Sequence, residues 1–300
     1  MSAIKNLVEK NSFVKAWVYF FLGEVFSKNS FREKYIRITS RSLVWRKINL
    51  FFIKNFRKNE KIQDYPATID FDVKQHLDNV FKNGFSAGIT IPNSLLKELI
   101  AFSNEAKYRI NMNPDNLMQI QFDSPETTRE EGNHFNCLNA HLYNEACKKV
   151  AYDKNVLSVV RGYFGMEPVV SSSALLWSYP IHANGKCLGD NEWGFHYDLD
   201  DYKFLKIFIY LNDVDMQTGP HVLVEKTHIR KSFFEKLHRR MTDEEVKERF
   251  PEQIRIIQGK AGSAFFTDTY NIHKGLEPKK KRCIYQVTYS VTDIQKNKKK

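Results

Sequence analysis

The sequence lacks three features that would assign it to common functional classes. Its four cysteines are widely spaced and form no CxxC pair, which favours reduced thiols in a cytoplasmic protein over a disulfide framework or a zinc site. No apolar run approaches the roughly 20 residues that span a bilayer. The apolar stretch from Phe13 contains Lys15 and Glu24 and has no small-residue cleavage site, so we expect no signal peptide either. No GxGxxG or GxxxxGKS/T loop supports phosphoryl or hydride transfer with a nucleotide.

Charge is unevenly distributed along the chain. The net charge is +11, but residues 1–64 contain 14 Lys and Arg against 5 Asp and Glu, and the tail 296–300 adds four lysines. The long middle part is therefore close to neutral, which does not favour a polyanionic substrate. Nucleic acid is not an expected partner, because the basic charge is terminal and no strand combines basic and aromatic residues in a recognisable motif.

Three segments are expected along the chain. Residues 1–64 form a basic helical N-terminal segment, residues 65–295 form the main domain, and residues 296–300 form a basic tail. The stretch "SLVWRKINLFFIKNFRKN" has an apolar face with Lys and Arg on the other side, which favours an amphipathic helix packed on the main domain. The alternative is peripheral attachment to an anionic membrane surface or to a partner. In both cases we expect a cytoplasmic protein.

The main domain has the pattern of a mainly β fold with flanking helices. Helical patterns cover residues 140–162 and the insertion 232–254. β-Branched and aromatic residues alternate in the late segments "PVVSSSALLWSYP", "WGFHYDL", "KFLKIFIYLNDV", "HVLVEK", "SAFFTD" and "RCIYQVTYSV". Short strands with long connections, flanked by helices, predict a double-stranded β-helix (jelly roll) core.

His196 and Asp198 are the first candidate metal ligands. On a strand, residues two apart point to the same face, so an imidazole and a carboxylate would meet at one point. This tripeptide pattern is common by chance and needs a third ligand. His273 follows the expected strand "GSAFFTDTYNI", and a jelly roll brings a late strand end beside an early one. Two imidazoles and one carboxylate would form the facial triad of non-haem Fe(II) oxygenases.

Arg282 begins the last expected strand, nine residues after His273. One interpretation places it in the solvated basic cluster "KKKR" at 279–282, and its sequence context favours this. The other buries it beside an anion, since its planar guanidinium matches a carboxylate with two hydrogen bonds.

Several sequence pieces together resemble the phytanoyl-CoA dioxygenase-like branch of the Fe(II)/2-oxoglutarate-dependent dioxygenases. The resemblance covers roughly residues 68–292 and leaves out residues 1–64. The pieces occur in the family's order: "NGFSAGITIPNSLLKEL", "HYD", "FLKIFIYLNDVDMQTGPHVLVEKTH", "GSAFFTDTYNIHKG" and Arg282. In the third piece, "KTH" at 226–228 replaces the usual Gly-Ser-His.

The resemblance implies a role for each matching residue. His196, Asp198 and His273 would be the catalytic iron ligands, and Arg282 would bind the far carboxylate of 2-oxoglutarate. The implied enzyme uses Fe(II), 2-oxoglutarate and O2, releases succinate and CO2, and oxidises a small organic or a lipid- or glycan-type substrate. Halogenating relatives replace the carboxylate ligand by a small residue, so Asp198 favours hydroxylation. His228 is expected to be structural.

Lys206 and Trp177 are weaker candidates for binding the cosubstrate. A lysine inside a strand usually points to solvent; Lys206 would otherwise pair with Asp200 or Asp213, or reach a carboxylate of the substrate or cosubstrate. Trp177 would lie near the site if its strand neighbours residues 193–199, although core packing is its commoner role.

Two other functions are compatible with the sequence. A cupin-like isomerase or hydrolase would use the same three ligands without 2-oxoglutarate, and Arg282 would then have no anion to bind. A basic membrane-associated binding protein would act through residues 1–64 and the tail, and it would lose binding when these ends are removed.

Overall fold

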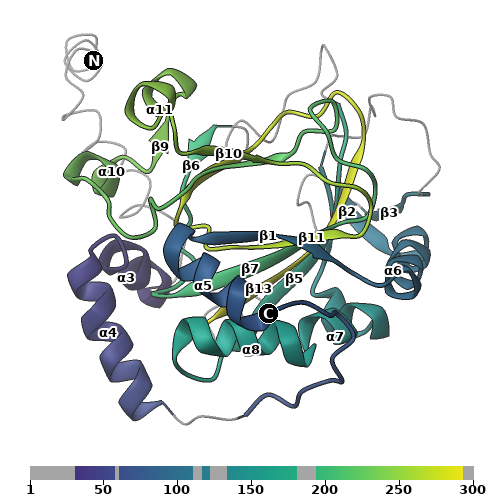
Figure 1. Ribbon diagram of the computed structural model, residues 1–300, viewed down its shortest axis with the longest axis horizontal. Helices are drawn as coiled ribbons and strands as arrows, with labels where there is room; N and C mark the ends of the chain where they lie inside the picture. The colour runs from purple at the N-terminus through teal and green to yellow at the C-terminus, as the bar shows by residue number, and fades with distance from the viewer. Residues whose placement is uncertain (1–30, 58–60, 111–116, 122–133, 181–193, 293–300) are drawn as a thin grey trace.

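Two antiparallel β-sheets face each other and form the body of the protein (Figure 1). The larger sheet has eight strands in the order β1-β11-β7-β13-β5-β4-β2-β3, and the smaller has five in the order β10-β8-β12-β6-β9. This is the jelly roll, mainly β with flanking helices, that the sequence predicts. The computed structural model describes residues 31–57, 61–110, 117–121, 134–180 and 194–292.

The elements have the following bounds. The larger sheet contains β1 (Phe85–Thr90), β2 (Lys107–Ile110), β3 (Leu117–Gln119), β4 (His134–Leu138), β5 (Val169–Ser178), β7 (Phe204–Tyr210), β11 (Ser263–Thr267) and β13 (Arg282–Ser290). The smaller sheet contains β6 (Phe195–His196), β8 (His221–Val224), β9 (Arg240–Met241), β10 (Ile254–Ile257) and β12 (Ile272–Gly275). The helices are α3 (Phe31–Thr39), α4 (Leu43–Phe56), α5 (Val73–Asn83), α6 (Asn93–Glu105), α7 (Glu145–Ala151), α8 (Lys154–Phe164), α10 (Phe233–Leu237) and α11 (Asp243–Arg249).

The larger sheet separates an outer helical layer from the space between the sheets. Helices α5, α7 and α8 lie on its outer side (Figure 1). Successive strand residues point to opposite faces, so on β7 the side chains of Leu205 and Ile207 enter the core shared with the helices. Lys206 and Phe208 alternate with them and line a cavity between the sheets. The same period on β5 and β13 decides which of their residues can reach a ligand.

Two helices behind the larger sheet begin and end where the sequence supplies caps. Asp72 and Asp153 accept hydrogen bonds from backbone N–H groups in the first turns of α5 and α8. Both helices end at a glycine in the left-handed conformation, Gly84 and Gly165. These signals hold the helical layer in register behind the sheet that carries the cavity.

Helix α4 lies at the side of the jelly roll and is fastened to it by two arginines (Figure 1). Arg46 donates from Nε to the carbonyl oxygen of Tyr202 at 2.6 Å, and Arg57 donates to the carbonyl oxygen of Glu167 at 2.6 Å. None of the helices among the described residues is both long enough and apolar enough to cross a bilayer. Residues 1–30 and the tail 296–300 lie outside the described residues.

Several strands differ from the sequence prediction. Strand β6 has only two residues, so Asp198 follows it and is not on it. His273 lies on β12, which a turn separates from β11. Strand β10 overlaps the end of the expected helical insertion, and β2, β3 and β4 were not predicted. These strands are short. They form mainly because they pair with neighbouring strands in the sheet, and their own residue patterns are weak.

Candidate metal centre

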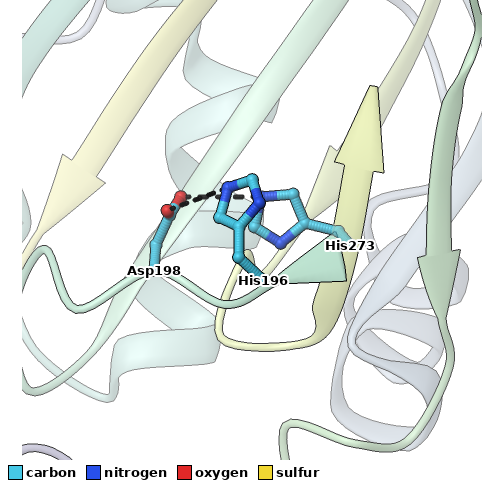
Figure 2. Close-up of side chains that lie close together, drawn as sticks. All are labelled: His196, Asp198 and His273. Carbon is cyan, nitrogen blue, oxygen red and sulfur yellow. Dashed lines mark ion pairs between the residues drawn. The ribbon is translucent and has the colours of Figure 1, made fainter. Parts of the chain in front are cut away.

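His196, Asp198 and His273 converge on one point (Figure 2). Nε2 of His196 lies 3.8 Å from Oδ1 of Asp198, and Nε2 of His273 lies 3.8 Å from Oδ2 of the same carboxylate. One donor atom from each residue lies within 4.8 Å of the other two. Ligands about 2.1 Å from one ion lie roughly 3–4 Å from each other, so the three side chains fit a single metal ion.

Main-chain contacts bring the three residues together. Strands β6 and β12 pair antiparallel, and His196 lies directly opposite His273. Beyond the short strand, the backbone N–H of Asp198 donates to the carbonyl oxygen of Thr269 at 2.8 Å. The expected same-face geometry of a continuous strand is therefore wrong for Asp198, and this hydrogen bond to the turn before β12 holds the carboxylate in place.

Both imidazoles are oriented by hydrogen bonds on the side away from the carboxylate. Nδ1 of His196 lies 2.8 Å from the carbonyl oxygen of Gly194, and Nδ1 of His273 lies 2.9 Å from that of Asn271. A carbonyl oxygen only accepts, so each Nδ1 carries a proton, and in the neutral ring Nε2 is then the nitrogen with the lone pair. This is the arrangement in which histidine binds metals.

Asn271 ties this site to the helical layer. Its Nδ2 donates to the carbonyl oxygen of Asn83 at 3.1 Å, and its Oδ1 accepts the backbone N–H of His228 at 2.7 Å. The His228 ring is buried against Asn271 and the carbonyl oxygen of Phe81. His228 therefore holds the loop before β12 and lies outside the metal-binding group, as the sequence interpretation expects.

Lys206 is largely buried and lies beside the candidate ligand Asp198. Its Nζ lies 2.7 Å from Oδ2 of Asp198 and 3.0 Å from Oδ2 of Asp200. Burial is the largest influence on the pKa of the Asp198 carboxyl and would raise it, but the Lys206 ammonium together with His273 and His196 outweighs burial and holds that pKa well below its usual range. Burial lowers the pKa of His273 to about 3, which keeps its imidazole neutral. The expectation that Lys206 points to solvent is wrong; of the alternatives, the structure contains the pair with Asp200.

Arg282 lines the same cavity, which has a volume of about 300 Å³. It is buried and donates hydrogen bonds to the carbonyl oxygen of Gly219 and, at 3.4 Å, to Oγ of Ser178. Gly219 has a φ of 73°, and a Cβ there would meet the carbonyl oxygen of Leu276 at 2.3 Å, so this turn requires glycine. The solvated-cluster interpretation of Arg282 is therefore wrong, because its guanidinium turns inward at the start of β13.

His221 is a cavity residue that the sequence interpretation missed. Its ring stacks on His273, with centroids 5.4 Å apart, and it packs against Phe208 and Phe265. Burial holds the pKa of His221 well below its usual range. Within the described part of the chain, its buried Nε2 has no hydrogen-bond partner. Its position as first residue of the expected strand "HVLVEK" was the available signal, since Leu223 shares its inward face.

Trp177 points away from the cavity. On β5, Leu176 and Ser178 line the cavity, and Trp177 between them packs into the core on the helical side. It lies in a tilted contact with Tyr179, with ring centroids 6.0 Å apart. The prediction that Trp177 binds a cofactor is therefore wrong, because the period of two places it on the opposite face of the sheet.

Similar folds occur among solved structures. No protein-family model matches the chain and no curated protein matches its sequence, so membership of the phytanoyl-CoA dioxygenase-like branch stays a prediction. EctD from S. alaskensis with bound Fe is 15% identical, with a TM-score of 0.51 over 79% of this chain and 80% of that chain. The structure of EctD with 2-oxoglutarate and 5-hydroxyectoine is 17% identical, with a TM-score of 0.51 over 77% and 79% of the two chains. At these identities the similarity shows a common fold.

Proposed function

We propose that this protein is an Fe(II)- and 2-oxoglutarate-dependent oxygenase that hydroxylates a small organic or a lipid- or glycan-type substrate. The observation that carries the proposal is a single cavity that combines two histidines and one aspartate with a buried arginine. The three donors match the facial triad of non-haem iron enzymes. EctD shares the fold and holds Fe in one structure and 2-oxoglutarate in another, which supports the same cofactors here.

His196, Asp198 and His273 would hold the iron ion. When bound with its cosubstrate, iron supplies the activation of O2 that oxidises a substrate while 2-oxoglutarate is converted to succinate and CO2. The chain itself contributes two imidazoles whose Nδ1 atoms are hydrogen-bonded and whose Nε2 atoms face the carboxylate, together with an ionised carboxylate. Three donors on one side leave the remaining coordination positions for small molecules.

Arg282 would bind the far carboxylate of 2-oxoglutarate. Its guanidinium lies in the wall of the cavity, and the hydroxyl of Ser178 is close enough to contribute a second donor. Phe208 and Ile284 form an apolar wall beside it. An apolar wall excludes water and so strengthens the interaction between the guanidinium and a carboxylate.

Asp198 bears on the outcome of the reaction. Family resemblance associates a small residue at this position with halogenation, and the chain has a carboxylate instead, so we propose hydroxylation. A phytanoyl-CoA dioxygenase-like enzyme is the finer form of this proposal. The cavity volume of about 300 Å³ suits a small molecule or one end of a longer one.

The test is the formation of succinate from 2-oxoglutarate by the full chain with Fe(II) and O2 across a pool of small metabolites and lipids. We expect succinate release to rise with an accepted substrate and to vanish in the His196→Ala variant. The matched control is His76→Gln, because His76 is buried against Oγ of Ser86 and away from the cavity. Iron binding without turnover of 2-oxoglutarate would favour the cupin-like alternative, and failure to bind Fe(II) would exclude the proposal.

A further inference from the structure

The outer face of helix α4 is apolar and exposed. Six of its fourteen residues are large hydrophobic residues with exposed fractions between 40% and 76%: Val44, Trp45, Ile48, Phe51, Phe52 and Phe56. With about 100° between successive helical residues, these six share one side of the helix along its length. We call them the α4 stripe. Monomeric proteins rarely expose so much contiguous apolar surface without an interaction to cover it.

The opposite side of α4 is already occupied. Arg46 and Arg57 hold that side against the jelly roll, and the Arg46 guanidinium lies 3.9 Å from the centre of the Tyr270 ring. Leu50 and Ile53, also on that side, pack against the main core. The helix is therefore fixed in the orientation that presents the α4 stripe outwards, so burial of the stripe against the jelly roll would break these contacts.

Basic residues border the stripe. At about 100° per residue, Lys47 and Lys54 lie between the Phe51 edge of the stripe and the anchored side of the helix, and both are exposed. The helix sequence LVWRKINLFFIKNF contains no acidic residue. The charge that would complement this edge is negative and must come from outside α4.

We propose that the α4 stripe docks the protein on an anionic lipid surface. The aromatic side chains would enter the boundary between headgroups and acyl chains, and Lys47 and Lys54 would meet lipid phosphates. A second copy of the chain fits less well, because it would bring more cations to the same contact and α4 has no acidic residue to pair with them. Helix α3, which precedes α4 in the chain, also exposes large hydrophobic residues: Phe31, Tyr35 and Ile38.

This inference stands apart from the proposed oxygenase function, since none of the stripe residues lines the cavity. It concerns where the enzyme works: a membrane-bound chain would meet substrates at the lipid surface at raised local concentration. Loss of lipid docking would leave iron binding unchanged, and loss of iron binding would leave docking unchanged.

The experiment is co-sedimentation of the full chain with vesicles of phosphatidylcholine alone and of phosphatidylcholine with phosphatidylserine. We expect binding to the anionic vesicles, a decrease of at least about 10-fold in Phe51→Ser/Phe52→Ser, and a similar decrease in Lys47→Glu/Lys54→Glu. The matched control is Phe233→Ser/Phe234→Ser, which removes two exposed phenylalanines of α10 and should keep full binding.

A second readout uses Trp45 in the stripe. Its fluorescence should shift to shorter wavelength on anionic vesicles, and the shift should be lost in Trp45→Phe while binding is kept. The proposal is overturned by equal binding to neutral and anionic vesicles, by full binding of either stripe variant, or by the absence of sedimentation. It is also overturned if the stripe variants abolish a concentration-dependent dimer of the lipid-free chain in analytical ultracentrifugation.

Discussion

The cavity and helix α4 both depart from the usual distribution, in which charged side chains face water and large apolar side chains are buried. The cavity encloses charged side chains, whereas α4 exposes apolar ones. The cavity encloses Arg282, which is buried, and Lys206 and Asp198, which are largely buried; these residue types are almost never fully buried without a partner. Helix α4 exposes large apolar residues that would normally be buried, such as Phe51 and Phe56. Enclosing charged side chains and exposing large apolar ones both cost free energy when the protein is alone in water.

The cavity and α4 differ in what compensates for this unfavourable free energy. Inside the cavity, most of the compensation is supplied by the fold: Lys206 forms ion pairs with Asp198 and Asp200, and carbonyl oxygens orient His196 and His273. Around α4, no described part of the chain covers the stripe. A buried polar site therefore indicates chemistry carried by the protein, and an exposed apolar face indicates contact with something outside it.

The largest expected effect is the loss of a ligand. In His196→Ala, we expect the affinity for Fe(II) to fall by at least about 100-fold, because changing only the groups that orient a ligand already costs about 10- to 100-fold. Anaerobic titration calorimetry with Fe(II) measures this. An affinity within a factor of two of the unmodified chain would show that the cavity is not the metal centre, and His76→Gln serves as the control.

Removing Lys206 tests whether the cavity is compensated from within. Lys206→Met leaves two carboxylates without their cation, and breaking a buried ion pair destabilises by about 3 kcal/mol. Because Asp198 and Asp200 are partly accessible, we expect a decrease of about 2 kcal/mol in the free energy of unfolding, measured in urea. The double variant Lys206→Met/Asp200→Asn should recover part of it. No recovery would mean that Lys206 acts by packing and not by charge.

Arg282 is the positively charged cavity residue that we propose binds a carboxylate of the cosubstrate. Arg282→Met should raise KM for 2-oxoglutarate by about 10- to 100-fold, the range for a lost charge-assisted hydrogen bond. Arg282→Lys keeps the charge without the planar fork and should fall between. The measurement is succinate release at varied 2-oxoglutarate, and a change confined to kcat would argue against carboxylate binding.

Lys231 offers a contrasting buried cation. It donates to the carbonyl oxygen of Tyr270 at 2.7 Å, and burial lowers its pKa to about 7. The unfolded chain then binds more protons between pH 7 and about 10.5, so the stability of the folded chain should rise with pH over this range. The rise should be smaller in Lys231→Met, as measured by urea unfolding at several pH values. Parallel profiles for the two chains would contradict the lowered pKa.

The smallest expected effect concerns the exposed α4 stripe. Without lipid, Phe51→Ser/Phe52→Ser should change the free energy of unfolding by less than about 0.5 kcal/mol, because surface substitutions away from packed groups have small effects. Urea denaturation of the lipid-free chain measures this. A loss of 2 kcal/mol or more would mean that the stripe is covered within the chain.

The sequence predicted the fold class, and it named the three candidate ligands that the structure brings together, because both inferences depend on local or ordered signals. Alternating apolar residues mark β5, β7 and β13, and the order of "HYD", His273 and Arg282 resembles that of the dioxygenase family which the sequence suggested. The prediction for Trp177 was wrong because its position along a strand does not tell which face of the sheet its side chain points to until the register of the strand is known.

Other features depend on contacts that the sequence does not display. Lys206 looks like a solvent-facing lysine until β7 is paired between β11 and β13, which puts its even-numbered residues toward the cavity. His221 was obscure because its neighbours, His273 and Phe265, are distant in the chain. Asp198 lies beyond its strand and depends on Thr269.

Strand β6 has two residues; His196 on it lies 77 residues before His273 in the chain, and Asp198 just after it lies 75 residues before His273. An ion held by all three would act as a cross-link that closes this long loop, and its binding free energy would add to the stability of the fold. Withdrawal of the ion with a chelator should loosen the pairing of β6 with β12 before the rest of the smaller sheet. A bound iron ion would then stabilise the fold as well as take part in the reaction. The protein's lifetime in the cell would depend on iron supply.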